Sequence, residues 1–261
     1  MSNTPFSVKV AVVTGGASGM GKITALRLAN AGAQVAILDM NQAALDATAA
    51  ESTNIHPFHC DVTNIAQVQE IISQVENTLG PIDRLTHCAA IMPTAPILEQ
   101  PAELITKMMT INYGGTVNLV KTVLPLMNQR KSGQLVIFGS IAGSVLGPEL
   151  AGYNATKAAT NAFVEVLIHE NRGSGVHILL VCPPMVKTPL IEQGLGTKNI
   201  AESLEKNRMA DPEFIVDEID KALTKGPKKE ILLPGAEAKI LMLFRRLFPG
   251  LLWKIIKLSM K

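Results

Sequence analysis

Apolar residues follow two alternating patterns along the chain. Short continuous runs, such as residues 10–13 and 135–138, alternate with longer stretches in which apolar positions recur every three or four residues. Short runs bounded by turn residues are typical of buried strands, and the longer period is typical of helices that cover a sheet. We expect strands near residues 8–14, 34–38, 55–59, 82–87, 133–138, 176–182 and 230–233.

Helices are expected in the intervals between these strands, including a long helix over residues 103–130 and others over 151–172 and 212–225. Strands that alternate with helices predict an α/β fold with a Rossmann-type, doubly wound parallel sheet of about seven strands. We expect this body to be a single domain over residues 1–235. In such sheets, ligands bind at the carboxyl ends of the strands.

A glycine-rich turn follows the first predicted strand. Gly15, Gly19 and Gly21 allow a close approach of the backbone to a pyrophosphate, and the helix over residues 22–30 offers unpaired N–H groups at its start. The second strand ends at Asp39, eighteen residues after Gly21. An acidic residue about 20 positions beyond the glycines is expected to bind a ribose hydroxyl. These features predict a dinucleotide site.

Tyr153 and Lys157 are four residues apart, so on a helix they share a face. A nearby cation favours phenolate and is expected to lower the phenol pKa from about 10. A phenol tuned in this way is suited to act as a general acid and base. Ser140 follows the apolar run at 135–138 and can present its hydroxyl to the same reacting oxygen. The three residues predict a proton-transfer site.

The combined spacing resembles the short-chain dehydrogenase/reductase family over about residues 7–235. The residues that carry the resemblance are the Thr14-Gly15-x-x-x-Gly19-x-Gly21 turn, Asp39, Asp61, Asn112, Ser140 and the Tyr153-x-x-x-Lys157 pair. The resemblance implies a nicotinamide-dependent oxidoreductase. It makes Tyr153 the acid and base, Ser140 the residue that orients the substrate oxygen, Lys157 the partner of Tyr153 and the nicotinamide ribose, and Asn112 the holder of a proton-relay water. Separately, we expect no metal site.

The same resemblance implies the residues of the cofactor site. Asp61 and Val62 would flank the adenine, and Thr188 would contact the nicotinamide carboxamide. The full implied set is Thr14, Gly15, Ser18, Gly19, Met20, Gly21, Asp39, Asp61, Val62, Ala89, Tyr153, Lys157, Pro183, Val186 and Thr188.

Two segments depart from the family pattern. The chain has His87-Cys88-Ala89-Ala90 where Asn-Asn-Ala-Gly is common, and Pro184 where glycine is usual. The methyl group of Ala90 is expected to change the local geometry beside the cofactor. We interpret His87 and Cys88 as packing residues at the end of a buried strand, without a direct chemical role.

Composition and charge narrow the class of protein. A chain of 261 residues, 47% hydrophobic and 18% charged, can form one large domain with a substantial core. Its net charge of +2 argues against a nucleic-acid partner. Three cysteines without metal-ligand spacing favour a reducing compartment. The N-terminus lacks the pattern of a signal peptide, and no apolar run is long enough to span a membrane, so we expect a cytoplasmic protein.

Residues 184–211 are expected to form a loop over the substrate. Gly194 and Gly196 would give this loop mobility. Apolar residues in the loop and near other strand ends favour a hydrophobic alcohol or ketone, although they can also serve only to pack the loop on the body. These residues are Ile91, Met92, Leu98, Val145, Leu146, Leu190, Ile191, Leu195, Ile200, Leu204 and Met209.

The C-terminal residues 236–261 form an amphipathic and basic tail. Apolar residues recur on one helical face, at Ile240, Leu243, Phe244, Leu247 and Phe248. The tail has six basic residues and one acidic residue, a net charge of +5, which leaves −3 for the rest of a chain whose total is +2. This pattern fits a helix at a membrane surface, and equally a tail that packs on its own domain, closes the pocket or joins a partner subunit.

These features predict an oxidoreductase that transfers a hydride between NAD(H) and a hydrophobic secondary alcohol or ketone. NAD is favoured over NADP because Asp39 would repel a 2′-phosphate and neither Met40 nor residues 16–18 supply a cation. The alternatives are an NADPH-dependent 3-keto lipid reductase and a non-catalytic cofactor-binding scaffold. We expect a homodimer or homotetramer.

Overall fold

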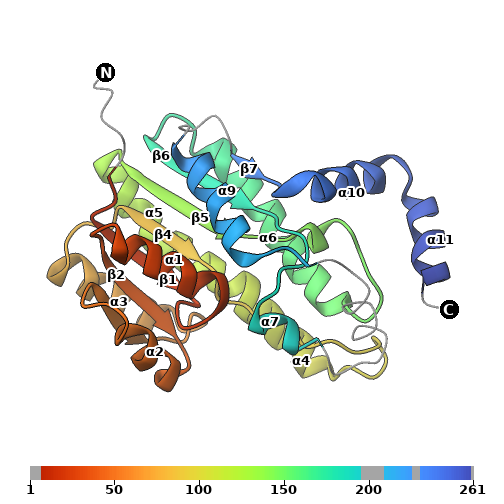
Figure 1. Ribbon diagram of the computed structural model, residues 1–261, viewed down its shortest axis with the longest axis horizontal. Helices are drawn as coiled ribbons and strands as arrows, with labels where there is room; N and C mark the ends of the chain where they lie inside the picture. The colour runs from red at the N-terminus through yellow and green to blue at the C-terminus, as the bar shows by residue number, and fades with distance from the viewer. Residues whose placement is uncertain (1–6, 195–208, 225–229, 260–261) are drawn as a thin grey trace.

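A parallel sheet forms the centre of the computed structural model, which describes residues 7–194, 209–224 and 230–259 (Figure 1). In the described residues the sheet has seven strands in the order β3-β2-β1-β4-β5-β6-β7. The doubly wound α/β fold expected from the sequence is therefore confirmed. The strands are β1 Val10–Thr14, β2 Gln34–Asp39, β3 Ile55–His59, β4 Arg84–His87, β5 Gly133–Phe138, β6 Val176–Val181 and β7 Ile231–Leu232.

The strand order reverses between β1 and β4, which pair directly although more than sixty residues separate them. Val13 pairs with Ile37 of β2 on one side and with Thr86 of β4 on the other. Every residue of β1 is buried, because helices cover both faces of the sheet. The reversal opens a crevice at the carboxyl ends of these strands, where the glycine turn and Asp39 lie.

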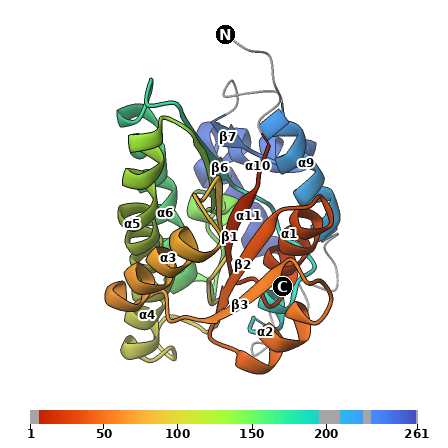
Figure 2. The ribbon, with the colours of Figure 1, turned by 90° about the vertical axis from the view of Figure 1, so that its left-hand side faces the viewer.

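Helices form a layer on each face of the sheet (Figure 2). Helices α1 and α9 cover one face, and α3, α5 and α6 cover the other. The helices are α1 Gly19–Asn30, α2 Gln42–Ala49, α3 Ile65–Thr78, α4 Ala102–Met109, α5 Gly115–Arg130, α6 Ala151–Glu170, α7 Pro189–Glu192, α9 Pro212–Thr224, α10 Gly235–Leu247 and α11 Pro249–Ser259.

The helix expected over residues 103–130 is not one regular α-helix. A π-helical turn at Thr110–Gly114 separates α4 from α5, and it contains Asn112. Such turns are rare and often occur at functional sites, because the extra residue in the turn changes the direction of a side chain. The sequence pattern gave no indication of this turn, and the expectation of a regular helix was wrong here.

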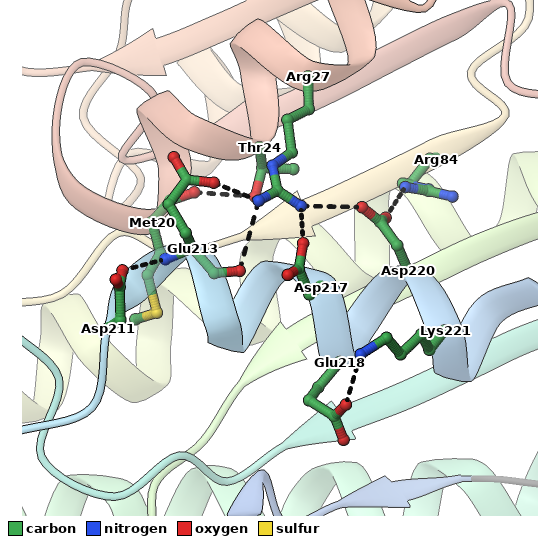
Figure 3. A network of polar contacts seen from close by, with 10 residues as sticks. All are labelled: Met20, Thr24, Arg27, Arg84, Asp211, Glu213, Asp217, Glu218, Asp220 and Lys221. Carbon is green, nitrogen blue, oxygen red and sulfur yellow. Dashed lines mark hydrogen bonds and ion pairs between the residues drawn. The ribbon is translucent and has the colours of Figure 1, made fainter.

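Arg27 joins the two helices on one face of the sheet (Figure 3). From α1, its guanidinium binds the carboxylates of Glu213 and Asp217 on α9. Asp220, one turn further on, lies 3.6 Å from both Arg27 and the buried Arg84 of β4. Exposed ion pairs each contribute only about 0–1 kcal/mol, so the network chiefly fixes the position of α9 against α1. It thereby holds α9 against the helix that follows the glycine turn.

Helices α10 and α11 follow β7 at the edge of the sheet and extend away from the two layers (Figure 1). Helix α10 begins at Gly235, where a φ of +80° suits glycine. The chain thus ends in the amphipathic helical tail expected from the sequence. Among the described residues, no helix is both long and apolar enough to cross a bilayer.

Candidate active site

The backbone of the glycine turn packs closely on itself and on the backbone of the residues that follow β4. Gly15 and Gly19 have φ values of +64° and +51°, in the left-handed region that favours glycine. A Cβ at Gly21 would overlap the carbonyl oxygen of Gly15, and one at Gly15 would come within 2.9 Å of the Ala89 nitrogen. The turn therefore packs directly on the residues that follow β4.

Helix α1 begins in this turn with its N–H groups available. Ser18 is the N-cap residue, but its side chain makes no capping hydrogen bond, and the first turn has no acidic residue. Unpaired N–H groups and the helix dipole favour an anion at this position. The start of α1 can thus bind a pyrophosphate, as the sequence predicts.

Two carboxylates lie at the ends of the neighbouring strands. Asp39 ends β2 and accepts hydrogen bonds from the backbone N–H groups of Ala17 at 3.4 Å and Asn41 at 3.1 Å. Asp61 follows β3 and accepts hydrogen bonds from the N–H and hydroxyl of Thr63 at 2.9 and 2.7 Å. These contacts hold both carboxylates at the rim of the crevice.

A cavity of about 840 Å³ connects these features. Pockets for cofactors are commonly about 300–1,000 Å³, so this cavity can hold a dinucleotide. Its lining includes most of the implied cofactor residues: Gly15, Ser18, Gly19, Met20, Gly21, Asp39, Asp61, Val62, Ala89 and Thr188. Helix α4 adds lining residues that the sequence did not indicate: Glu103, Leu104, Thr106 and Lys107.

Three other implied cofactor residues lie beneath this surface. Thr14 is fully buried, and its hydroxyl shares a 2.6 Å hydrogen bond with His87. Val186 packs in the core beneath α9. Pro183 accepts a hydrogen bond from the Ile141 N–H at 3.2 Å, which links the end of β6 to the loop that follows Ser140. These residues shape the site from behind its lining.

Helix α6 brings the proposed proton-transfer group together. Lys157 Nζ lies 5.8 Å from the centre of the Tyr153 ring and donates a 2.8 Å hydrogen bond to the Phe138 carbonyl. The Ser140 side chain acts to lower the pKa of the Tyr153 phenol, and its hydroxyl accepts a 3.0 Å hydrogen bond from the Ala142 N–H. Ser140, Tyr153 and Lys157 are all buried. The arrangement places a phenol, a hydroxyl and an ammonium group in one small volume.

Burial dominates the ionisation of this group. It raises the pKa of Tyr153 to about 12, and the Ser140 side chain has a smaller effect in the other direction. Burial also lowers the pKa of Lys157 to about 8. The expectation that Lys157 lowers the phenol pKa below its ordinary value was therefore wrong for the protein without bound cofactor. The ammonium group donates to the Phe138 carbonyl, and desolvation of the phenolate outweighs its attraction.

The Asn112 side chain links α6 to the loop that follows β4 through hydrogen bonds. Its side chain exchanges two 2.9 Å hydrogen bonds with the backbone of Ile91 and donates to the Thr156 hydroxyl at 3.0 Å. The Thr156 hydroxyl in turn donates to the Tyr153 carbonyl at 2.8 Å. These contacts give Asn112 a positioning role, and its role in holding a relay water stays a prediction.

Asn161 is a site residue that the sequence reasoning missed. Its side chain accepts from the Ser140 N–H at 3.3 Å and donates to the Ser140 carbonyl at 2.8 Å. A Cβ at Gly139 or Gly143 would overlap the Asn161 amide, so both glycines make room for it. Asn161 lies four residues after Lys157, and this continued spacing along one face of α6 was the available signal.

His87 and Cys88, which depart from the family pattern at the end of β4, are both uncharged at neutral pH. Burial, with a smaller effect of the Lys157 charge, lowers the pKa of His87 to about 3. Burial raises the pKa of the Cys88 thiol to about 12. The His87 Nδ1 atom is bound to Thr14, which is a packing and hydrogen-bonding role. Ala90 lines the cavity, so its extra methyl group is accommodated.

Helix α7, in the segment expected to cover the substrate, packs beside Tyr153. Leu190 and Ile191 of α7 pack against a buried cluster of Met92, Met108 and Tyr153. The side-chain oxygen of Gln193 accepts a 2.8 Å hydrogen bond from the Met92 N–H. These contacts make the wall beside the phenol largely apolar.

Not every residue expected at this pocket lies there. Leu98 is 97% exposed, so the expectation that it lines the pocket was wrong. Gly194 was expected to give mobility, but its carbonyl accepts a 3.1 Å hydrogen bond from the Thr94 hydroxyl. Val145, Leu146 and Met209 are partly buried. Leu195, Gly196, Ile200 and Leu204 lie outside the described residues.

Comparison with known proteins identifies the family. A sequence model described as short chain dehydrogenase matches residues 9–198. The chain belongs to the short-chain dehydrogenase family. This short-chain dehydrogenase is therefore an oxidoreductase that acts on CH–OH groups, as the sequence pattern predicts. Its cofactor class is NAD(P).

Relatives and structural neighbours agree with this assignment. The chain is 33% identical over 189 residues to a 2-dehydro-3-deoxy-L-rhamnonate dehydrogenase (NAD(+)) of a Sphingomonas species. The matched region covers 72% of this chain and 76% of that protein. The chain is also 30% identical over 198 residues to mouse epidermal retinol dehydrogenase 2, with 73% and 64% covered. A short-chain dehydrogenase/reductase of Burkholderia phymatum, solved in complex with NAD, has the same fold, with a TM-score of 0.84, 23% identity and 95% and 96% of the two chains covered.

Proposed function

We propose that this short-chain dehydrogenase interconverts hydrophobic secondary alcohols and ketones with NAD(H). The observation that supports this most strongly is the buried face of α6, where Tyr153 and Lys157 lie near Ser140, at the same edge of the sheet as the glycine turn. The bound nicotinamide would supply or accept the hydride. The residues of the chain orient the substrate and move the proton.

Tyr153 is the proposed proton donor and acceptor at the substrate oxygen. Its raised pKa of about 12 keeps the phenol protonated at neutral pH, so it can donate a proton to the oxygen of a ketone that is being reduced. Ser140 would donate a second hydrogen bond to that oxygen. Oxidation of an alcohol requires loss of the phenol proton, and the positive charge of Lys157 would favour this step.

The proposed cofactor is NAD(H) rather than NADP(H). The Asp39 carboxylate at the cavity rim can accept hydrogen bonds from ribose hydroxyls and would repel a 2′-phosphate. Lys22, at the start of α1, is already paired with Glu51 at 2.7 Å. The NAD named for the Sphingomonas enzyme and bound in the Burkholderia structure supports the same choice.

The proposed substrate is hydrophobic. The relatives include one named for a polar sugar acid and one named for retinol, so sequence identity does not decide between polar and apolar substrates. The wall beside Tyr153 favours the apolar class, because Ile91, Met92, Leu190 and Ile191 pack there. We propose residues 184–211 as the substrate loop of a catalytic body over residues 1–235. A 3-keto lipid reductase that uses NADPH would share this wall and differs in the cofactor it requires.

A turnover screen with the full chain tests the proposal. Secondary alcohols and ketones with alkyl, steroid or terpenoid groups would be compared with sugar acids, each with NAD(H) and NADP(H). We expect turnover of the apolar compounds and a higher kcat/KM with NAD(H). A preference for NADPH with 3-keto lipids would favour the reductase instead. Tight NAD binding without turnover of any compound would favour a non-catalytic scaffold.

The proposal extends to the setting of the enzyme. We propose a cytoplasmic homodimer or homotetramer, with residues 236–261 as a tail outside the catalytic body. Sedimentation velocity of the full chain tests the assembly, since a single species at the monomer mass would exclude it.

A further inference from the structure

Helix α10 exposes an apolar face to solvent. Ile240, Leu243 and Leu247 are 67%, 58% and 58% exposed, and their spacing of three and four residues places them on one side of the helix. The opposite side contains the buried Ala238 and the partly buried Leu241. The helix therefore uses one apolar side to pack on the protein and leaves a second apolar side uncovered by the described residues.

Helix α11 repeats this arrangement. Leu251, Ile255 and Leu258 recur every three or four residues on its exposed side, and Leu258 is 72% exposed. Leu252, on another side, is buried. At the end of α10, just before α11 begins, Phe244 and Phe248 pack with ring centres 5.6 Å apart. Large apolar residues grouped in this way on a surface mark a site of interaction.

Charges beside these faces indicate what covers them. Lys239 and Arg246 are exposed and lie along one edge of the α10 face, and Lys254 is exposed beside the α11 face. The tail has a net charge of +5, whereas the other residues carry −3 in total. A two-fold pair of these faces would bring like charges together, because each copy contributes the same patch. An anionic lipid surface matches both the apolar and the cationic residues.

We propose that α10 and α11 attach the enzyme to an anionic membrane surface. The outward apolar side chains would enter the boundary between headgroups and acyl chains, and the cations beside them would pair with lipid phosphates. This attachment does not depend on the proposed reaction. The tail also contacts the active-site region. Arg245 Nε, on the inner side of α10, donates a 3.2 Å hydrogen bond to the Ser144 carbonyl, in the loop that follows Ser140. The tail is thereby tied to the substrate side of the site.

Vesicle flotation with the full chain tests the attachment. The vesicles are phosphatidylcholine alone or phosphatidylcholine with phosphatidylglycerol. We expect binding only to the anionic vesicles, with weaker binding as salt increases. The double variants Leu243→Ser/Leu247→Ser and Lys239→Gln/Arg246→Gln should each reduce the partition coefficient by about tenfold or more. Matched controls are Ile65→Ser on α3 and Lys121→Gln on α5, exposed residues outside the tail that should leave binding unchanged.

NAD affinity and the melting temperature of each variant show whether it is folded. If the Leu243→Ser/Leu247→Ser variant does not fold, Leu251→Ser/Ile255→Ser on α11 takes its place. The proposal is overturned if the full chain does not float with anionic vesicles, or if the leucine variants bind as well as the full chain. It is also overturned if these variants change only the sedimentation velocity, since that result assigns the face to a second copy of the chain.

Discussion

Helices α6 and α10 both depart from the usual pattern in which apolar side chains are buried and charged side chains are exposed. Helix α6 turns polar side chains inward, so that Lys157 is only 4% exposed, whereas α10 turns apolar side chains outward, so that Ile240 is 67% exposed. Each arrangement costs free energy in an isolated soluble domain, through desolvation of a charge in one helix and hydration of apolar surface in the other. A buried charge and an exposed apolar face are informative because packing alone does not explain either. We interpret the first as the site of the proposed chemistry and the second as the site of the proposed contact with a membrane surface.

The strongest way to break this comparison is to remove the buried charge. Lys157→Met keeps a similar length, and we expect kcat to fall by about 10²–10³-fold, because Tyr153 loses the cation that favours its phenolate. Weaker cofactor binding should accompany this loss. Steady-state kinetics and NAD titration measure both effects, and an unchanged kcat would contradict the role given to the charge.

The same variant makes a prediction about stability and pH. Burial lowers the pKa of Lys157 to about 8 in the folded protein, below its ordinary value of 10.5. At this group the unfolded chain therefore binds more protons between these pH values, so the contribution of Lys157 to the free energy of unfolding should rise between pH 8 and 10.5. The Met variant lacks this titration, and its melting temperature relative to wild type should be highest below pH 8. Parallel stability curves for the two proteins would show that the charge is not buried.

Asp39→Ala tests the cofactor end of the site, away from both helices. It removes the carboxylate that would accept ribose hydroxyls and repel a 2′-phosphate. We expect kcat/KM with NAD to fall by about tenfold, since a hydrogen bond to a charged group contributes about 1.5–3 kcal/mol. The preference for NAD over NADP should narrow. A wild-type enzyme that already prefers NADP would contradict the assignment of Asp39.

Asn161→Leu tests whether α6 also positions Ser140, because we predict that Asn161 affects catalysis only through its contacts with Ser140. We expect a reduction of kcat by about threefold to tenfold, with KM for NAD unchanged, because the variant loosens the backbone that presents the Ser140 hydroxyl. Asn161→Asp, which keeps an acceptor for the Ser140 N–H, should retain more activity. Equal losses of kcat and NAD affinity would indicate general disruption of the site.

The smallest effect on catalysis is expected on α10. The single variant Leu243→Ser changes an exposed residue, and we expect a change in unfolding free energy within about 0.5 kcal/mol and an unchanged kcat with a water-soluble substrate. Chemical denaturation and steady-state kinetics measure these quantities. A large loss of stability would mean that the face packs on the protein in solution.

Much of the fold could be predicted because the central strands are buried on both faces. Their continuous apolar runs, such as β1 and β5, contain the signal that identifies them. Tyr153 and Lys157 were found because a local spacing of four residues places them together. The outward face of α10 was likewise visible in its local period, whereas what covers it depends on chemistry outside the chain.

Features that depend on distant parts of the chain could not be predicted. The π-helical turn contains Asn112, whose side chain is hydrogen-bonded to the backbone of Ile91, twenty-one residues away. The raised pKa of Tyr153 depends on burial under α7 and the loop after β4, which no local pattern reveals. The exposed position of Leu98 has the same origin, because hydrophobicity alone does not determine which residues of a loop face the site.

The most direct test of the central claim compares the wild-type protein with Tyr153→Phe, in turnover and in NAD binding on the same preparations. The variant removes only the phenol hydroxyl, so NAD affinity should stay close to that of the wild type while kcat at saturating substrate falls by about 10²–10⁴-fold. Such a result would assign proton transfer to Tyr153. A variant that binds NAD and retains the wild-type kcat would contradict the account.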